Sequence, residues 1–257
     1  MRITSELTNI IPLHGNYSQG ENVKKTYYPA GDFRSEMSIE LLQQADILVS
    51  NPPFTYFKEY IDQIMLYNKQ FLVLGSMNAI TYKNFFPLLQ KNQVWLGYSS
   101  GTKTYLVPDS YVQLYPSRAF RTEEGWKTKL GNTVWYTNLE NEKRYNAIPL
   151  NSDCSYLAHP EEYPTYVNYD GINVDRVSRI PYDYAGVMGV PIGFLEKYCP
   201  HQFEILGLSL FLATPIKKVA RTDDRRYEKG GNRLYLRTDP HTLKRMYERL
   251  LIRRLQP

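Results

Sequence analysis

The sequence predicts an α/β fold, in which a mostly parallel sheet is followed by a mixed, β-rich C-terminal region. Between residues 35 and 98, apolar runs of strand length alternate with amphipathic helical patterns, and this alternation is typical of parallel strands joined by right-handed crossovers. Short β-type runs separated by turn residues then replace it. With 257 residues, the chain is long enough for one or two domains with buried cores.

The first three elements follow from capping, apolar runs and prolines. Ser35 is a good N-cap for a helix over residues 35–45. The apolar run 46–50 has the length of a buried strand. The strand must stop at the two prolines that begin at Pro52, because proline cannot donate to a β-ladder. Apolar and aromatic residues then share one face of residues 55–68, which predicts an amphipathic helix.

The alternation continues through two further strands. Residues 70–74 form a second apolar run of strand length, and residues 94–98 form a third. Residues 81–91 between them indicate a helix, or two half-helices broken near Pro87. We therefore expect these three strands to be neighbours in one parallel sheet.

Later segments have a different pattern. Short β-type runs occur at residues 104–107, 111–115 and 133–137, with turn residues between them. The C-terminal end is ambiguous, because residues 241–254 fit a basic helix while residues 246–254 equally fit an edge strand. No internal repeat or low-complexity tract is present.

Composition excludes several classes of protein. No apolar stretch approaches the ~18 residues that a membrane span requires, and the N-terminus lacks the layout of a secretory signal, so we expect a cytoplasmic protein. Cys154 and Cys199 are too few for a disulfide framework, and we interpret both as structural. The four histidines lie far apart in the sequence. We therefore expect no metal site.

Positive charge is concentrated at the C-terminal end. Residues 217–257 hold 13 Lys and Arg against 5 Asp and Glu, while the rest of the chain is slightly acidic. Such a segment suits a polyanion, because cationic side chains release counterions from phosphates; a solvated basic face fits equally well. The candidate phosphate contacts are Lys217, Lys218, Arg221, Arg225 and Arg226.

The most informative motif is Asn51-Pro52-Pro53-Phe54, directly after the first predicted strand. In open α/β sheets, ligands bind outside the carboxyl ends of the strands. An Asn side-chain oxygen and a fixed proline carbonyl can together accept both hydrogens of an exocyclic amine, which orients the nitrogen lone pair toward an electrophilic methyl group. Phe54 can stack on a base taken out of the duplex. A proline-stiffened turn with an Asn cap is the simpler alternative.

The motif and its surroundings resemble the EcoRI-type adenine-specific DNA methyltransferases. The resemblance extends intermittently from about residue 30 to 207 and rests on Gly31–Ser35, Asp46–Phe54, Asn78–Lys83, Val94–Gly97, Trp135–Leu139 and Gly186–Ile192. It implies a Rossmann-like methyltransferase core over 1–145 and a DNA-contacting, target-recognition region over 146–257. It also implies S-adenosylmethionine as cofactor, double-stranded DNA as partner and adenine N6 as acceptor. By this mapping Asn51–Phe54 meet the base, while Asp32 and Phe33 lie near the adenosine part of the cofactor.

The sequence departs from this family at its N-terminal end. Family members carry a first strand and a cofactor-binding loop ahead of the region that corresponds to Gly31, whereas only 30 residues precede it here. The nearest candidate loop is His14–Gly20. A second chain could supply the missing part. The alternatives are therefore a silent or split-enzyme DNA-binding remnant, and an amino-methyltransferase that acts on RNA or protein.

Overall fold

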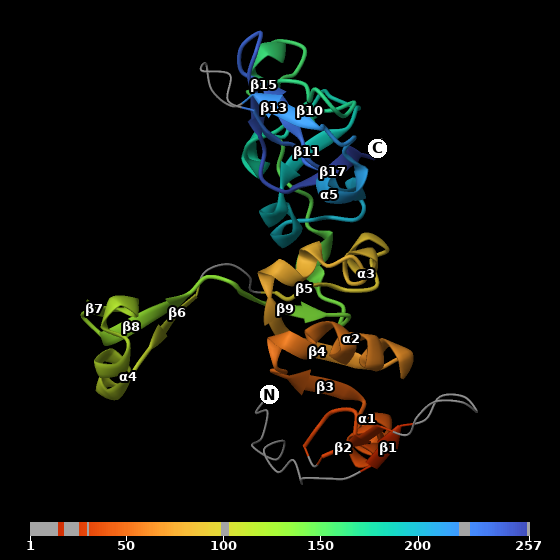
Figure 1. The fold of residues 1–257 in the computed structure, drawn as a ribbon, viewed down its shortest axis with the longest axis vertical. Helices are drawn as coiled ribbons and strands as arrows, with labels where there is room; N and C mark the ends of the chain where they lie inside the picture. The colour runs from red at the N-terminus through yellow and green to blue at the C-terminus, as the bar shows by residue number, and fades with distance from the viewer. Residues whose placement is uncertain (1–14, 18–25, 30, 99–102, 221–226, 256–257) are drawn as a thin grey trace.

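The computed structural model describes residues 15–17, 26–29, 31–98, 103–220 and 227–255. Two four-stranded sheets succeed one another along the long axis of the molecule (Figure 1). All strands of the first sheet lie between residues 47 and 137, and all strands of the second lie between residues 172 and 254. Among the described residues, no helix combines the length and the apolar character that a bilayer crossing requires.

The first sheet has the strand order β3-β4-β9-β5 and is accompanied by three α-helices. Their bounds are α1 (Glu36–Gln44), β3 (Ile47–Ser50), α2 (Phe57–Leu66), β4 (Gln70–Ser76), α3 (Phe86–Gln90), β5 (Trp95–Leu96) and β9 (Thr133–Thr137). Ser35 caps α1 as predicted, with its hydroxyl oxygen accepting from the Ser38 N–H at 3.4 Å. Strand–helix alternation is thus confirmed in this half of the chain.

The mostly parallel sheet is not confirmed. Strands β3 and β4 pair in parallel, but β9 enters between β4 and β5 and is antiparallel to both. Strands β3, β4 and β5 therefore run in one direction, as predicted, although β5 does not touch β4. The prediction that β3 is buried was wrong. It is an edge strand, and Ile47 and Val49 remain 46% and 41% exposed, because no strand covers its free side in the described chain.

A small lobe, which we call the arm, comprises residues 103–130 between β5 and β9. It contains β6 (Lys103–Leu106), α4 (Asp109–Leu114), β7 (Ala119–Thr122) and β8 (Gly125–Leu130). The three strands form an antiparallel sheet with β8 at its centre, and the arm projects away from the rest of the molecule (Figure 1). Residues 111–115, predicted as β, fall mostly within α4. The Tyr111 hydroxyl lies 3.3 Å from that of Thr128, so a tertiary contact favours the helix.

The C-terminal half is β-rich, as predicted, and its only α-helix among the described residues is the short α5 (Ser209–Leu212). Its sheet has the order β10-β11-β17-β12. The bounds are β10 (Ile172–Asn173), β11 (Met188–Pro191), β12 (Phe203–Leu208) and β17 (Arg249–Arg254). Of the two predictions for the C-terminal end, the helix over residues 241–254 was wrong and the strand within residues 246–254 is confirmed as β17, although this strand is central rather than an edge. Leu250, Leu251 and Ile252 are all fully buried, since both faces of the strand are covered.

Three antiparallel hairpins and several single-turn helices complete the fold. The hairpin strands are β1 (Gly15–Tyr17), β2 (Thr26–Tyr28), β13 (Lys218–Ala220), β14 (Tyr227–Lys229), β15 (Tyr235–Arg237) and β16 (Leu243–Arg245). The 3-10 helices are η2 (Phe54–Tyr56), η3 (Met77–Thr81), η4 (Pro116–Arg118), η5 (Glu142–Tyr145), η6 (Pro160–Glu162), η7 (Val177–Arg179) and η8 (Ile192–Glu196). Within the candidate loop His14–Gly20, residues 15–17 pair antiparallel with β2; the remainder lies outside the described residues.

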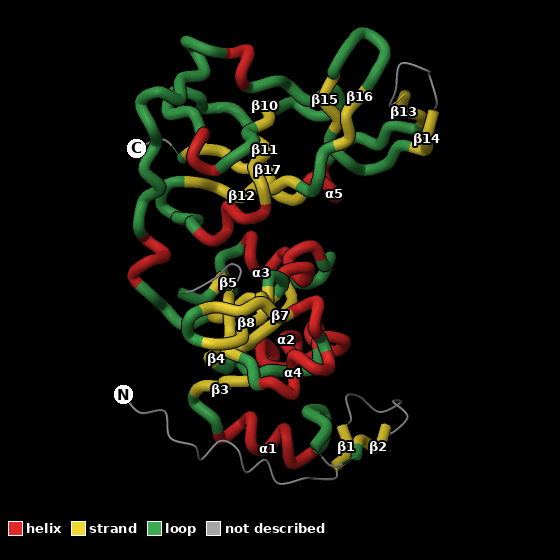
Figure 2. Tube along the Cα trace, turned by 90° about the vertical axis from the view of Figure 1, so that its left-hand side faces the viewer, coloured by secondary structure: helices red, strands yellow, loops and turns green. Residues whose placement is uncertain are grey.

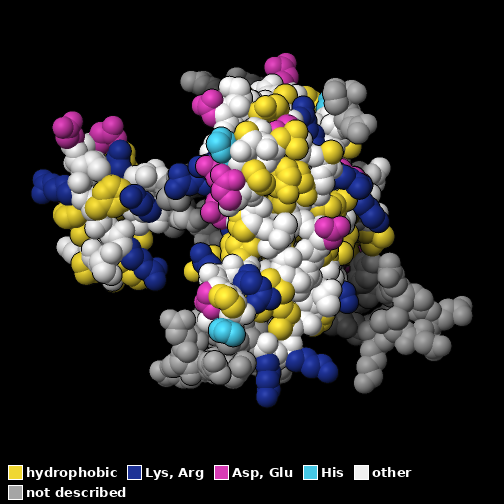
Figure 3. Space-filling model, turned by 90° about the horizontal axis from the view of Figure 1, so that it is seen from above, with side chains coloured by type: hydrophobic (Ala, Val, Ile, Leu, Met, Phe, Trp, Pro, Cys, Tyr) yellow, Lys and Arg dark blue, Asp and Glu magenta, His cyan; other side chains and the backbone are white. Residues whose placement is uncertain are grey.

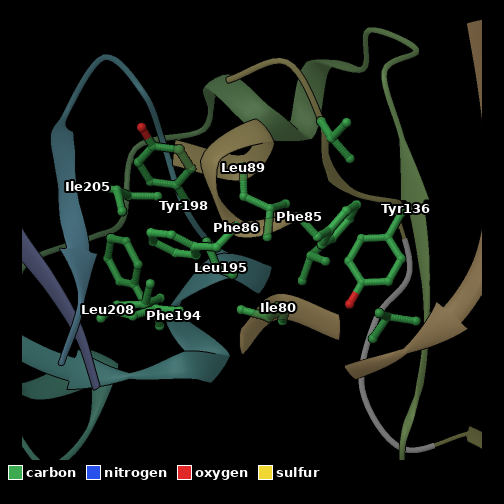
Figure 4. Packing of buried hydrophobic residues seen from close by; sticks show 14 of the residues in the cluster. Ile80, Phe85, Phe86, Leu89, Tyr136, Phe194, Leu195, Tyr198, Ile205 and Leu208 are labelled. Atoms are coloured by element: carbon green, nitrogen blue, oxygen red, sulfur yellow. The ribbon is translucent and has the colours of Figure 1, made fainter. Parts of the chain in front are cut away.

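Helix α3 lies between the two sheets (Figure 2), and a continuous apolar core surrounds it. Figure 4 shows Phe86 and Leu89 of this helix between Phe194 and Tyr198 on one side and Phe85 on the other. The Gln90 side-chain amide donates to the Leu206 carbonyl of β12 at 2.7 Å. The two sheets thus share one buried cluster. A domain boundary near residue 146 stays a prediction, which is supported by the fact that the strands of the two sheets come from separate parts of the sequence.

Replacement of Gly75 should reveal how closely α2 packs on the first sheet. A Cβ atom at this β4 position would lie 2.4 Å from Cε2 of Phe57, a side chain that is almost fully buried. We expect Gly75→Ala to lower the free energy of unfolding by about 1–3 kcal/mol, measured by urea denaturation. Gly193→Ala is the control, because nothing lies within 4 Å of a Cβ there. Equal stability of the two variants would contradict this packing.

Candidate functional site

The Asn51–Phe54 segment leaves the carboxyl end of β3 and is open to solvent. The Asn51 side chain is exposed, Pro52 is buried, and Phe54 is 40% exposed at the start of η2. A large aromatic side chain held at a strand end without a covering partner provides a face on which another ring can stack. The side chains of Asn51 and Phe54 are therefore not covered by the rest of the protein. A turn with only a structural role could be fully covered.

The backbone of this turn uses one proline carbonyl and leaves the other free. The Tyr56 N–H donates to the Pro53 carbonyl at 3.0 Å, which starts the 3-10 turn. Within the described chain, neither the Pro52 carbonyl nor the Asn51 side chain has a hydrogen-bond partner. Since Pro has no N–H and a restricted φ, this segment is stiff and presents two unpaired acceptors beside each other in sequence.

The end of β4 lies at the same edge of the sheet. Parallel pairing places Ser50 opposite Val73, so the residues that follow both strands emerge on one side. The Ser76 hydroxyl oxygen accepts from the Asn78 N–H at 3.2 Å and from the Asn132 side-chain amide at 3.1 Å. Asn78 is exposed. Asn78 therefore shares this edge of the sheet with Asn51.

The loop that holds Asp32 and Phe33 packs on the helix that follows the motif. The Phe33 ring meets the Tyr60 ring edge-on, with 5.1 Å between centroids, and lies 6.4 Å from the Tyr56 ring. The Gln63 side-chain amide donates to the Phe33 carbonyl at 2.8 Å. The structure thus joins the two predicted groups of site residues through α2, although they are some twenty positions apart in the sequence.

Arg34 is the centre of this loop and was not among the predicted site residues. Its guanidinium donates to both carboxylate oxygens of Asp32, at 2.9 and 2.7 Å, and lies over the rings of Tyr28 and Tyr56 at 4.3 and 4.9 Å. The Arg34 side-chain hydrogen bonds hold the pKa of Asp32 below its ordinary value, against the opposing effect of burial. The loop therefore carries a carboxylate that is ionised at neutral pH. The abundance of tyrosine was the only signal in the sequence that pointed toward such a cluster.

The predicted phosphate-binding residues lie in the other half of the molecule. Lys217 and Lys218 are exposed where β13 begins, whereas Arg221, Arg225 and Arg226 fall outside the described residues. Both views place β13 and β3 near opposite ends of the long axis (Figures 1 and 2). The structure therefore does not bring this basic segment to the Asn51 edge, and any ligand common to both must be extended.

The described residues hold no group of three or more His, Cys, Asp or Glu side chains with metal-binding geometry. Cys154 and Cys199 are buried as free thiols. Each donates to a backbone carbonyl, that of Ser178 at 3.7 Å and that of Tyr145 at 3.6 Å respectively. Burial and a hydrogen bond to the backbone are consistent with the structural role predicted for both cysteines.

Comparison with known proteins gives a consistent set of relatives. The family model described as adenine-specific methyltransferase EcoRI matches residues 3–255. The Escherichia coli Type II methyltransferase M.EcoRI is 45% identical over 179 residues, which is 68% of this chain and 54% of that protein. The Mycoplasma genitalium Type II methyltransferase M.MgeORF184P is 41% identical over 191 residues, or 73% and 60% of the two chains.

A third relative, the Mycoplasma pneumoniae Type II methyltransferase M.MpnI, is 34% identical over 202 residues, or 76% of this chain and 63% of that protein. The chain thus spans between 54% and 63% of the length of these curated relatives. No solved structure matches it.

The ion pair between Asp32 and Arg34 predicts a pH-dependent difference in stability. The folded-state pKa of Asp32 lies below the ordinary value of 3.8, so the ionised carboxylate stabilises the fold above pH 3.8 and loses this effect as the pH falls through its lowered pKa. We expect Asp32→Asn to cost about 1–2 kcal/mol at pH 7 and progressively less toward pH 3, measured by urea denaturation. Asp153→Asn, at an exposed position, serves as the control. A cost that is independent of pH would contradict this assignment.

Proposed function

The chain belongs to the EcoRI family of adenine-specific methyltransferases, and on this premise we propose that it methylates adenine N6 at specific sites in double-stranded DNA, with S-adenosylmethionine as methyl donor. In this proposal it is the modification enzyme of a restriction–modification system. This proposal is supported by its relatives, which are named Type II methyltransferases. A Rossmann-like core over residues 1–145, as the family implies, forms part of the same proposal.

One observation carries the proposal. Asn51, Pro53 and Phe54 are exposed at the carboxyl end of β3 while Pro52 is buried, and the Asn51 side chain and the Pro52 carbonyl are unpaired within the described chain. Ligands of open α/β sheets bind at such strand ends. Two free acceptors next to a 40% exposed phenyl ring match the needs of a planar base with an exocyclic amine.

The proposed chemistry follows from these groups. Asn51 Oδ1 and the Pro52 carbonyl each accept one N–H of the adenine amine, which holds the nitrogen lone pair in one direction. Both oxygens carry partial negative charge, so they would also stabilise the positive charge that grows on nitrogen as the new N–C bond forms and the carbon–sulfur bond of the methyl donor breaks. The methylated nitrogen would then release one proton to solvent. Phe54 stacks on the extruded base and keeps it from returning to the duplex. Pro53 limits the freedom of the turn and thereby fixes the two acceptors.

The residues at the proposed cofactor site fit the adenosine part of S-adenosylmethionine. When bound, this cofactor supplies an electrophilic methyl group on a sulfonium sulfur. Asp32 and Phe33 are half-buried, and a fixed carboxylate suits ribose hydroxyls while a phenyl ring suits the adenine face. Arg34 holds the Asp32 carboxylate, and its guanidinium lies 5.2 Å from the centre of the Phe33 ring.

The region 146–257 would recognise the target DNA. Lys217 and Lys218 are exposed and would neutralise backbone phosphates, as would the arginines of the same segment. Such contacts position a protein on DNA without reading its sequence. The expected cytoplasmic location stays a prediction.

Substitution of Asn51 tests the proposed reaction. We expect Asn51→Ala to lower the rate of labelled methyl transfer to duplex DNA at least about 100-fold, because one of two oriented acceptors is lost. Binding of the duplex should change little, since phosphate contacts dominate affinity. Asn146→Ala, in an exposed loop, is the matched control. Equal incorporation by the wild type and Asn51→Ala would remove Asn51 from the mechanism.

Titration with S-adenosylmethionine distinguishes the main proposal from a silent or split-enzyme remnant. The chain covers only part of the length of its relatives, so the cofactor site is the part to measure directly. We expect calorimetry to detect binding that Asp32→Ala weakens about tenfold or more, because the ribose loses a charged acceptor. DNA binding without cofactor binding would favour the remnant. The comparisons give no support for a second chain that supplies part of the cofactor site. Competition among DNA, RNA and protein as methyl acceptors identifies the substrate.

A further inference from the structure

The arm is attached at the same edge of the first sheet as Asn51. Strand β5, which precedes the arm, runs parallel in direction to β3 and β4, because both β4 and β5 are antiparallel to β9. Strand β9, which follows the arm, starts at Thr133 opposite Ser76, the last residue of β4. Both connections to the arm therefore leave the sheet at its carboxyl edge.

The return connection is fixed to that edge by hydrogen bonds. The Asn132 carbonyl accepts from the Met77 N–H at 2.9 Å, and the Asn132 side-chain amide donates to the Ser76 hydroxyl at 3.1 Å. These contacts tie the base of the arm to the turn after β4. The arm is thus anchored beside the candidate site, while its body extends away from the sheet (Figure 1).

One face of the arm is covered by its own helix. Thr128, in the central strand β8, is buried, and its hydroxyl contacts Tyr111 of α4 at 3.3 Å and donates to the Arg118 carbonyl at 2.9 Å. Because side chains alternate between the faces of a strand, Lys127 and Lys129 point to the opposite face. No element of the described chain covers that face.

The uncovered face combines cations with apolar and hydroxyl side chains. The strand register places Lys127 between Leu106 of β6 and Phe120 of β7, and places Lys129 beside Thr104. The Lys129 ammonium lies 5.3 Å from the centre of the Phe120 ring. Leu106 remains 62% exposed. A face that served only for solubility would not need two large apolar side chains beside its lysines.

One acidic residue of the arm reaches this face, because the Glu124 carboxylate pairs with the Lys127 ammonium at 2.5 Å. Glu123 and Glu124 occupy the turn between β7 and β8, where Glu124 pairs with Lys127, and Asp109 starts α4. In Figure 3 the arm is a separate lobe with several Lys and Arg side chains, and its acidic side chains gather at one end. At its margin, the Arg121 guanidinium lies 5.8 Å from the Trp126 ring. The face therefore combines the Lys129 cation and the Lys127–Glu124 ion pair with the apolar Leu106 and Phe120 side chains.

We propose that this open face of the arm, formed by Thr104, Leu106, Phe120, Lys127 and Lys129, binds the sugar–phosphate backbone of the DNA duplex that carries the target base. This inference rests on the proposed function, since a base at Asn51 brings its flanking backbone along the edge from which the arm extends. The lysines and the threonine hydroxyl suit phosphate oxygens, and the Leu106 and Phe120 side chains suit the apolar side of deoxyribose. The arm is thus a sequence-independent clamp, distinct from the basic C-terminal segment.

The salt dependence of binding tests the clamp. For the Lys127→Ala/Lys129→Ala variant of the full chain, we expect the slope of log affinity against log salt concentration for a fluorescein-labelled duplex to fall by about 2, because each phosphate contact contributes about 0.9. Affinity at low salt should drop about tenfold or more. Lys91→Ala/Lys197→Ala removes two other exposed lysines and should leave the slope unchanged.

The other outcomes are equally informative. If the arm variant binds the duplex with the affinity and the salt slope of the wild type, the clamp is overturned while the proposed function stands. A wild-type dimer that the arm variant converts to a monomer, seen by light scattering, would overturn it by assigning the face to a second copy of this chain. A wild type that binds no duplex at all would overturn the proposed function and the clamp together. Unchanged far-ultraviolet circular dichroism of the variant excludes misfolding as the cause of any loss.

Discussion

The parallel pairing of β3 with β4 is the constraint on which the rest of the structure depends. It requires α2 to cross from the end of one strand to the start of the next, and the close approach of Phe57 to Gly75 fixes this helix on the sheet. Parallel strands end at the same edge, so Asn51 and Asn78 emerge side by side. The candidate site is a consequence of that pairing and of the prolines that stop β3.

The surroundings of the site are built from elements that the pairing brings together. The start of α2 provides the surface on which the Asp32–Arg34 loop packs, and β9 enters antiparallel beside β4 so that the arm returns at the same edge. In the proposed function, an extended polyanion at Asn51 would therefore meet the motif and the arm, while the Asp32–Arg34 loop beside them holds the cofactor. The basic hairpin of the C-terminal half lies far along the long axis, which suits contact with a more distant part of the same ligand.

The second sheet stabilises the first through a shared core rather than through a separate interface. Helix α3 belongs to the first sheet in sequence, yet its Phe86 and Leu89 side chains pack against Phe194 and its Gln90 bonds to β12. Burial of this apolar surface on both sides of one helix favours a fixed relation between the two halves.

The sequence by itself determined the elements whose signals are local. Ser35 caps α1, the prolines end β3, and alternating apolar runs define β4 and β9, because caps, missing N–H groups and strand-sized runs act within a few residues. Tertiary structure alone decided the position of β9 between β4 and β5, the central place of β17, the helix at residues 109–114 and the role of Arg34. The first three depend on contacts between residues distant in sequence, and Arg34 contacts Tyr56 in addition to its neighbour Asp32. Such contacts leave no periodic trace in the chain.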